Sequence, residues 1–178
     1  MLIAAFLFNV SSAQTMKEKT VEVGGAAMYP SKNIVENAVN SKDHTTLVAA
    51  VKAAGLVETL MSAGPFTVFA PTNAAFGMLP AGTVEMLVKP ENKAKLTGIL
   101  TYHVVAGKLD ADALKAKIKE GKGTAELSTV AGGKLWVMKK DGKLWLKDEN
   151  GGMAEITIKD VYQSNGVIHV IDHVVLPK

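Results

Sequence analysis

Hydrophobic and polar positions follow two different periods along this chain. Between residues 34 and 120 apolar residues recur at three- and four-residue spacing in short runs, which predicts several short amphipathic helices. One helix has Leu47, Val48 and Val51 on its apolar face and is expected to stop at Gly55. The runs 66–70 and 101–105 are rich in aromatic and β-branched residues and predict short strands.

From residue 121 onward the period becomes two, and glycine-containing turns separate the runs. The clearest element is a β-hairpin of residues 134–140 and 143–147 around the two-residue turn Asp141-Gly142. Further strands are expected over 154–161 and 166–176. Helices followed by antiparallel strands, without regular alternation of strand and helix, predict an α+β fold.

The N-terminus differs from the rest of the chain. Residues 1–10 are almost wholly apolar and run into Ser11-Ser12-Ala13, which predicts a signal peptide over 1–13. The alternative is a buried N-terminal strand or helix. Residues 14–31 show neither period and are expected to form an extended arm before a domain over 32–178. The predicted location is therefore secreted, periplasmic or cell-surface, and not lipid-anchored, because the chain has no cysteine.

Charge composition narrows the classes of partner. All 20 basic residues are lysine, and a nucleic-acid partner is excluded because such proteins use the planar fork of arginine. The stretch 108–147 holds ten lysines against five acidic residues. These lysines are either solvated surface or a surface for acidic glycans or another anionic partner. The 178 residues contain no run long enough to span a membrane, so no membrane span is expected.

No motif for catalysis, a metal or a cofactor stands out. The chain has no Gly-x-Ser-x-Gly elbow, no phosphate loop and no His-Glu-x-x-His. His169 and His173 are four residues apart, but they lie in a predicted strand, where that spacing spans about 13 Å. We therefore expect no enzyme activity, no metal and no cofactor.

The predicted hairpin has two chemically different faces. The turn pairs Met138 with Trp145 and places Trp136 diagonally beside them. If the aliphatic face packs on the core, both tryptophans emerge beside Lys140 and Lys143, as a surface suited to a polysaccharide or a protein. The alternative is that a helix or the N-terminal arm covers them. The aliphatic face consists of Leu135, Val137, Leu144 and Leu146.

Three sequence blocks resemble the fasciclin domain family. Residues 66–76 read FTVFAPTNAAF, residues 165–177 read NGVIHVIDHVVLP, and Tyr102-His103 lies between them. These are similar to the two signature blocks and the tyrosine-histidine motif of the family, and the likeness spans about residues 31–178. It implies a wedge-shaped β-sandwich with several short helices packed around it, of a single-domain, secreted bacterial type. It also implies a role in adhesion and extracellular association.

The resemblance also points to particular residues. Animal relatives bind integrins through the tyrosine-histidine motif, which here implies binding positions at Tyr102, His103, Val104 and Val105. The alternative is a core strand whose histidine bonds a buried neighbour. The signatures further place four polar residues in or beside the sandwich, where they are expected to form a structural polar network: Thr72, Asn73, His169 and Asp172.

The leading hypothesis is a non-catalytic adhesion module that binds a cell-surface or matrix protein or polysaccharide. The alternatives are a secreted carrier of a small apolar ligand and an unrecognised enzyme. A pocket lined by apolar side chains would favour the carrier, whereas a deep cleft with paired titratable groups would favour the enzyme.

Overall fold

Short helices occupy most of the first half of the chain, as the hydrophobic pattern predicts. The computed structural model describes residues 18–178, so the predicted signal peptide lies outside the described residues. Two short 3₁₀ turns, Lys42–His44 and Pro90–Asn92, precede α2 and α6. The helices are α1 (Ile34–Ala38), α2 (Thr45–Ala54), α3 (Val57–Met61), α4 (Asn73–Gly77), α5 (Thr83–Leu87), α6 (Lys93–Tyr102) and α7 (Ala111–Glu120).

Local chemistry explains where these helices begin and end. Asn33 and Glu36 form a capping box at the start of α1, in which each side chain accepts a backbone N–H of the other residue. The Asp110 side chain caps α7, as expected, by accepting the N–H of Ala113. Helix α2 ends at Gly55, whose φ of 73° favours glycine.

The strands form one large sheet and one separate hairpin. The larger sheet has the order β4-β3-β9-β8-β7-β6-β5, and β1 and β2 form a separate two-stranded sheet. Neighbouring strands of the larger sheet are antiparallel except for β3 and β9, which are parallel. The strands are β1 (Val21–Val23), β2 (Ala26–Met28), β3 (Phe66–Pro71), β4 (Val104–Ala106), β5 (Thr124–Ser128), β6 (Lys134–Lys140), β7 (Lys143–Lys147), β8 (Met153–Gln163) and β9 (Gly166–Ile171).

The long strand β8 belongs to both layers of a wedge. Its first residues pair with β7, and from Ile156 onward it pairs with β9. Register shifts on both sides of Ile158 bend the strand between the layers. A single bridge between Val105 and Thr129 links the two ends of the sheet, which nearly closes on itself. The predicted α+β fold with a wedge-shaped β-sandwich is confirmed.

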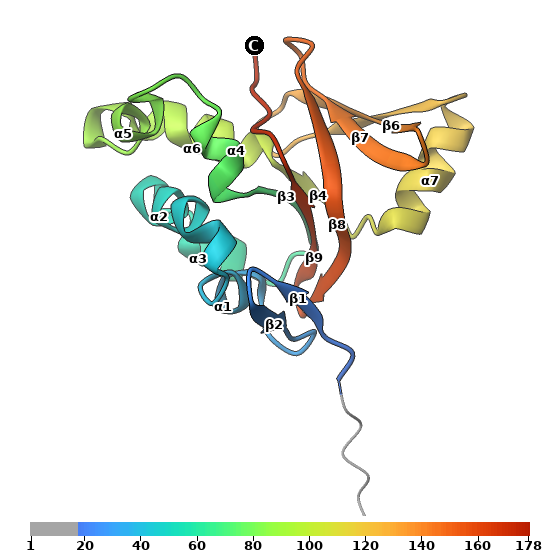
Figure 1. Cartoon of the computed structure of the whole chain (residues 1–178), viewed down its shortest axis with the longest axis horizontal. Coiled ribbons are helices and arrows are strands. Elements are labelled where there is room, and N and C mark those ends of the chain that lie inside the picture. Colours follow the sequence, from blue (N-terminus) through green and yellow to red (C-terminus); the bar gives the residue numbers. More distant parts are fainter. Residues whose placement is uncertain (1–17) are drawn as a thin grey trace, which may run out of the picture.

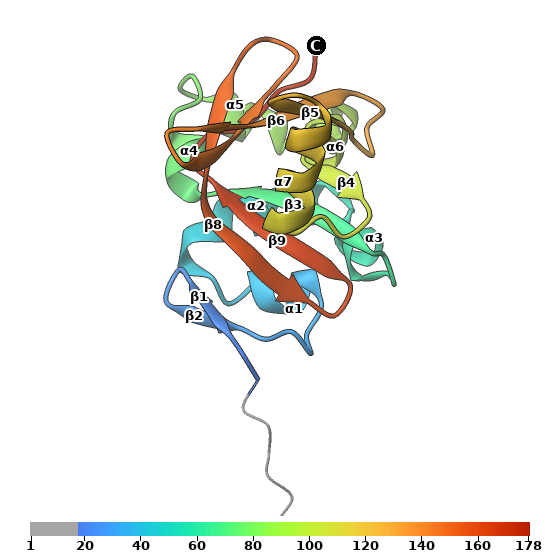
Figure 2. The same cartoon turned by 90° about the vertical axis from the view of Figure 1, so that its right-hand side faces the viewer.

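Two hydrophobic cores hold the wedge together. In the first, helices α1 to α6 pack on one side of β3 and β9, with Leu47, Leu96 and Ile168 among the buried side chains (Figure 1). The second fills the inside of the nearly closed sheet. Helix α7, seen in front in Figure 2, covers this second core beside β5 and β6, and its Leu114 is fully buried there.

The structure differs from the sequence-based expectations in three elements. Residues 21–28, within the extended arm expected over 14–31, form the β1–β2 hairpin, and Val23 and Met28 are buried in the first core. Helix α6 continues to Tyr102, so only Val104–Ala106 of the strand expected over 101–105 is strand. Strand β9 ends at Ile171, earlier than expected. None of the helices in residues 18–178 has the length and apolar character needed to cross a membrane.

Candidate functional site

The β6–β7 hairpin has the register and the two faces that its sequence predicts. Met138 pairs with Trp145, and Lys140 pairs with Lys143 across the turn. All four aliphatic residues of the inner face are buried in the second core. The outer face therefore carries Trp136 and Trp145.

Both tryptophans are half-buried, and their rings lie among lysine and methionine side chains. The Lys140 ammonium lies 5.9 Å from the centroid of the Trp145 ring, within the range of a cation–π contact. The indole Nε1 of Trp145 is buried and has no hydrogen-bond partner among residues 18–178. Beside Trp136 and Met138 lies a groove of about 420 Å³ whose far wall is residues 147–151. We call Trp136, Met138 and Trp145 the aromatic face.

Charged side chains surround the aromatic face. The Lys143 ammonium lies 2.7 Å from a Glu155 carboxylate oxygen, and Lys134 makes a similar pair with Glu126 at 2.8 Å. The hydrogen bond to Glu155 raises the pKa of Lys143. This arrangement, flat aromatic rings inside a charged rim, is suited to stacking on sugar rings or to a partner protein's side chains.

Tyr102 is a buried core residue. Its ring is fully covered, its hydroxyl donates to the Lys134 carbonyl at 2.5 Å, and the hydroxyl accepts the Glu149 N–H at 3.2 Å. Burial raises the pKa of Tyr102 to about 12. The residue therefore ties the end of α6 to the start of β6 and presents no exposed surface.

His103 and the two valines after it are equally enclosed. The His103 Nδ1–H donates to the Ile99 carbonyl at 2.8 Å, and Nε2 accepts the Val175 N–H at 3.2 Å. Burial lowers the pKa of His103 to about 4, so the ring is neutral at pH 7. Val104 and Val105 are also buried. The geometry supports the core alternative for this segment, because Tyr102, His103, Val104 and Val105 offer no exposed contact surface.

The four residues expected to form one polar network occupy separate places. Thr72 caps α4 through the Ala75 N–H. Asn73 accepts the Thr46 N–H and donates to the Lys42 carbonyl. His169 is fully buried and donates to the Leu109 carbonyl, whereas half-buried Asp172 accepts the Glu155 N–H. Each side chain therefore joins neighbouring backbone segments, and the four do not bond to one another through their side chains.

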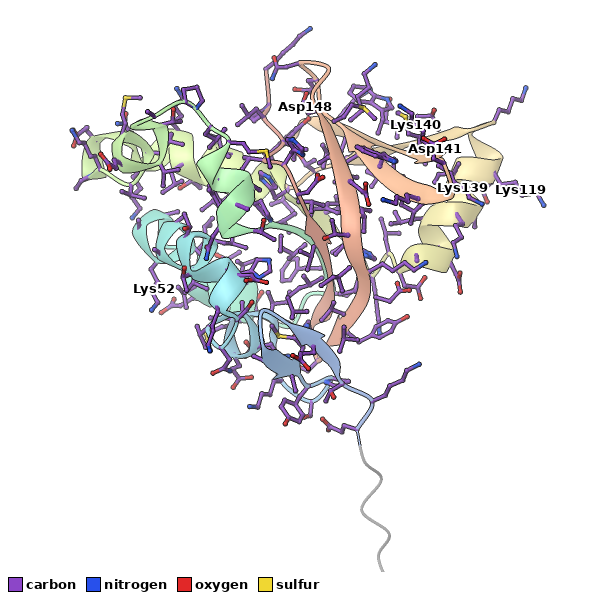
Figure 3. The ribbon with its side chains drawn as sticks, in the orientation of Figure 1. Lys52, Lys119, Lys139, Lys140, Asp141 and Asp148 are labelled. Atoms are coloured by element: carbon purple, nitrogen blue, oxygen red, sulfur yellow. The ribbon has the colours of Figure 1, made fainter. Side chains whose placement is uncertain are left out.

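An apolar groove lies between the helices and the sheet. It has a volume of about 70 Å³, several times the space that one water needs. Side chains from α1, α2, α3, α6 and β3 line it, along with buried Val104 and exposed Val130. Among residues 18–178, Lys52 on α2 is the one charged side chain in its lining, and Figure 3 shows it on the helical side of the molecule. Such a lining suits an alkyl chain or an apolar side chain.

Ser41 and His44 lie within hydrogen-bond distance of each other, away from these surfaces. Ser41 Oγ lies 2.9 Å from His44 Nδ1, but both side chains are buried and neither lines a described pocket. Gly24 of the β1–β2 turn packs directly on Ser41 Oγ. Within residues 18–178, no cluster of three or more His, Asp or Glu side chains could hold a metal ion.

Two structurally important polar residues were not singled out by the sequence. Asp148 is buried and accepts the N–H groups of Asn150, Gly152 and Leu176. Asn165 is buried and bonds to backbone groups of three other residues. Asp148 lies three residues before the turn glycine Gly151, and Asn165 lies in a turn directly before Gly166; Asp and Asn beside glycine are a local turn signal.

The fold and the surfaces together define a class of protein: a helix-covered wedge of β-sheet that carries an aromatic face and an apolar groove. The model of the fasciclin domain family matches residues 42–177. This chain belongs to the fasciclin domain family.

Relatives with different degrees of sequence identity support this match. The chain is 52% identical over 160 residues to Protein sll1483 of Synechocystis sp., covering 90% of this chain and 82% of that protein. It is 37% identical to the immunogenic protein MPB70 of Mycobacterium bovis, covering 79% of this chain and 66% of that protein. It is 37% identical to the transforming growth factor-beta-induced protein ig-h3 of Sus scrofa, covering 74% of this chain but only 17% of that protein.

One solved structure supports the fold. A domain pair of the insect cell adhesion molecule fasciclin I superimposes with a TM-score of 0.73 at 19% sequence identity, covering 83% of this chain and 52% of that chain. At this identity the likeness concerns the fold alone.

Proposed function

We propose that this protein is a non-catalytic binding module that attaches to a cell-surface or matrix protein or polysaccharide through the aromatic face. The observation that carries the proposal is the two-sided β6–β7 hairpin. Its aliphatic side is buried in the second core, while Trp136 and Trp145 remain half-exposed inside a charged rim. Aromatic side chains in such a setting supply large contact area at little entropic cost.

The comparisons support a role outside the cytoplasm. One solved neighbour is described as a cell adhesion molecule, and a mycobacterial relative is named a cell surface glycolipoprotein. The apolar residues 1–10 and the small residues after them support export through a signal peptide over 1–13. Adhesion to an envelope polymer requires export, because the protein can bind that polymer only outside the cytoplasm.

The test is binding of the chain from Gln14 to a glycan array and to cell-envelope fractions. The variant Trp136→Ala/Trp145→Ala is expected to lose at least tenfold in affinity, because both stacking platforms are removed. Tyr29→Ala is the matched control, since Tyr29 is an exposed aromatic residue at the end of β2. Circular dichroism and thermal unfolding check that each variant folds. Wild-type affinity in a folded tryptophan variant would refute the proposal.

A second candidate function is the carrier of a small apolar ligand, and the apolar groove favours it. At about 70 Å³ the groove is well below the range of about 300 to 1,000 Å³ for sites that enclose whole small molecules, so it would hold only part of an alkyl chain. The enclosed part would contact the aliphatic lining, and Lys52 would suit an anionic head group outside it. The test is titration with the fluorescent fatty acid cis-parinaric acid. Val48→Phe and Val57→Phe, at two half-buried lining positions, are expected to abolish binding by filling the groove. Unchanged binding in both variants would exclude the groove as the site.

A further inference from the structure

Strand β8 changes partners beside the tip of the β6–β7 hairpin, and this change opens a gap. Strand β7 pairs with β8 only through Trp145–Lys147, opposite Met153–Glu155. From Ile156 onward β8 pairs with β9 instead. Lys143 and Leu144 therefore have no strand partner on β8, and the hairpin tip stands away from the sheet.

Lysines from four elements line the cleft that results. The cleft has a volume of about 220 Å³ and is bounded by Lys115 of α7, Lys139 of β6, Lys143 of β7 and Lys159 of β8. Glu155 is the one acidic residue that the described part of the chain contributes to its lining. We call this cleft, with its four lysines, the lysine cleft. Figure 3 shows Lys139 at this end of the molecule, close to the labelled Lys119, Lys140 and Asp141.

Half of this positive charge has no acidic partner. Lys143 pairs with Glu155 and Lys115 pairs with Asp112, at 2.7 and 3.1 Å. Lys139 and Lys159 form no ion pair with any residue in the described part of the chain. A cleft lined by charges of one sign focuses its field and concentrates counter-ions there. An anion bound between Lys139 and Lys159 would relieve their mutual repulsion.

The lysine cleft and the aromatic face meet at Lys143 and Glu155, whereas Lys139 pairs with Leu144 and lies on the aliphatic side of the hairpin. A polymer that occupies both surfaces therefore passes over the edge of β7 at Lys143, where β7 is not paired with β8. Trp145 pairs directly with Glu155, the residue that holds Lys143 at the cleft rim. Neighbouring strands are about 4.8 Å apart, so the aromatic face begins one strand from the rim. A ligand that occupies both surfaces needs acidic groups and flat apolar ring faces at short intervals, which is the chemistry of an acidic polysaccharide.

We propose that the lysine cleft binds the carboxylate or sulfate groups of an acidic polysaccharide whose neighbouring sugar rings lie on Trp145 and Trp136. This inference rests on the proposed function of the aromatic face and names its ligand class. A volume of about 220 Å³ lies below the range of about 300 to 1,000 Å³ for sites that enclose whole small molecules. The cleft therefore suits one charged group of a polymer.

The test compares each acidic polymer with a neutral form of the same backbone. Oligogalacturonate is compared with its methyl ester, alginate oligomers with their esters, and dextran sulfate with dextran. At least one acidic form is expected to bind tenfold or more tightly than its neutral form, and to weaken as salt rises. Lys139→Gln/Lys159→Gln is expected to abolish this preference and flatten the salt dependence. Lys95→Gln, an exposed lysine of α6 on the helical side, is the matched control.

The outcomes separate this inference from the proposed function. Equal binding of acidic and neutral forms, still lost in Trp136→Ala/Trp145→Ala, would overturn the lysine cleft and leave the aromatic face standing. An equal loss in Lys95→Gln would overturn the cleft in favour of general surface charge. Lysine-dependent binding to phosphatidylglycerol vesicles without binding to any of the acidic polymers would overturn it in favour of a membrane surface. Failure of all three acidic polymers to bind would also refute it.

Discussion

Three of the four histidines are buried, and burial is the largest cause that lowers the pKa of each: His44, His103 and His169. In His103 and His169 one ring nitrogen donates to a carbonyl and the other accepts a backbone N–H. This pattern requires a neutral ring, since protonation would replace an acceptor by a second donor. These histidines therefore act as polar links between backbone segments.

Acid is expected to destabilise the protein through these rings. The folded pKa of His103 is about 4 and its ordinary value is 6.5, so the unfolded chain binds more protons between these values. Stability is therefore full above pH 6.5 and falls as the pH drops toward 4. For His103 alone the loss between pH 7.5 and pH 5 amounts to about 2 kcal/mol.

Urea denaturation at both pH values, on the wild type and on His103→Gln, measures this contribution. Glutamine cannot be protonated in this range, so the variant is expected to lose about 2 kcal/mol less than the wild type over the same interval. Equal losses in the two proteins would show that His103 titrates normally in the folded state.

The interior position of the tyrosine-histidine segment could not be decided from residue types. The run from Thr101 to Val105 favours a strand by its β-branched and aromatic content, and strand residues at the surface would look the same. Instead α6 continues through Tyr102, whose ring is fully buried in the second core. Tertiary packing overrides local preference here, because propensity contributes only tenths of a kcal/mol per residue, about tenfold less than burying a large side chain.

At the scale of elements, one side chain connects the helical layer to the sheet. The side-chain oxygen Oδ1 of Asn165 accepts the Ile34 N–H at 3.0 Å, where α1 begins. Its amide nitrogen donates to the carbonyls of Leu60 and Ser62, at 2.7 and 2.8 Å, where α3 ends. Asn165 itself lies in the turn between β8 and β9. Three segments far apart in the sequence thus share one amide.

Asn165→Ala is expected to lower the free energy of unfolding by about 3 kcal/mol. The substitution leaves a buried N–H and two carbonyls without their partner, and each such group costs about 1 to 3 kcal/mol unless water reaches it. Urea denaturation measures the loss. The matched control is Ser164→Ala, one residue earlier and exposed, which is expected to change stability by less than about 0.5 kcal/mol. If Asn165→Ala also changed the free energy of unfolding by less than about 0.5 kcal/mol, the Asn165 side chain would not stabilise the contact between the helices and the sheet.

Elements were predictable where short-range rules determine them. The two-residue turn at Asp141-Gly142 determines the register of the β6–β7 hairpin, and the alternation of its residues determines which face is buried. The parallel pairing of Phe66 with Gly166 was not predictable, because nothing local selects a partner about a hundred residues away. The lysine cleft depends on the same long-range topology, since it forms only where β8 leaves β7 for β9.

At the scale of the whole molecule, the β1–β2 hairpin closes one end of the first core. Val23 and Met28 are 2% and 3% exposed, and Asn37 of α1 exchanges two hydrogen bonds with the backbone of Tyr29. The Gly24 carbonyl accepts the Lys42 N–H at 3.1 Å. Residues 14–31 were expected to form an arm because glycines and polar residues interrupt every period there. Strands β1 and β2 have only three residues each, which is too short for an alternation of apolar and polar residues to be recognised in the sequence.

Removing this hairpin is therefore expected to weaken the entire domain. A chain that begins at Lys32 would lose the burial of Val23 and Met28 and the hydrogen bonds to Asn37, about 4 kcal/mol or more relative to a chain that begins at Glu18. Thermal and urea unfolding of the two chains measure the difference. An unpaired arm outside the core would leave the two chains equally stable. A large loss with one cooperative transition would show that the hairpin and the wedge unfold together, because the first core extends across both.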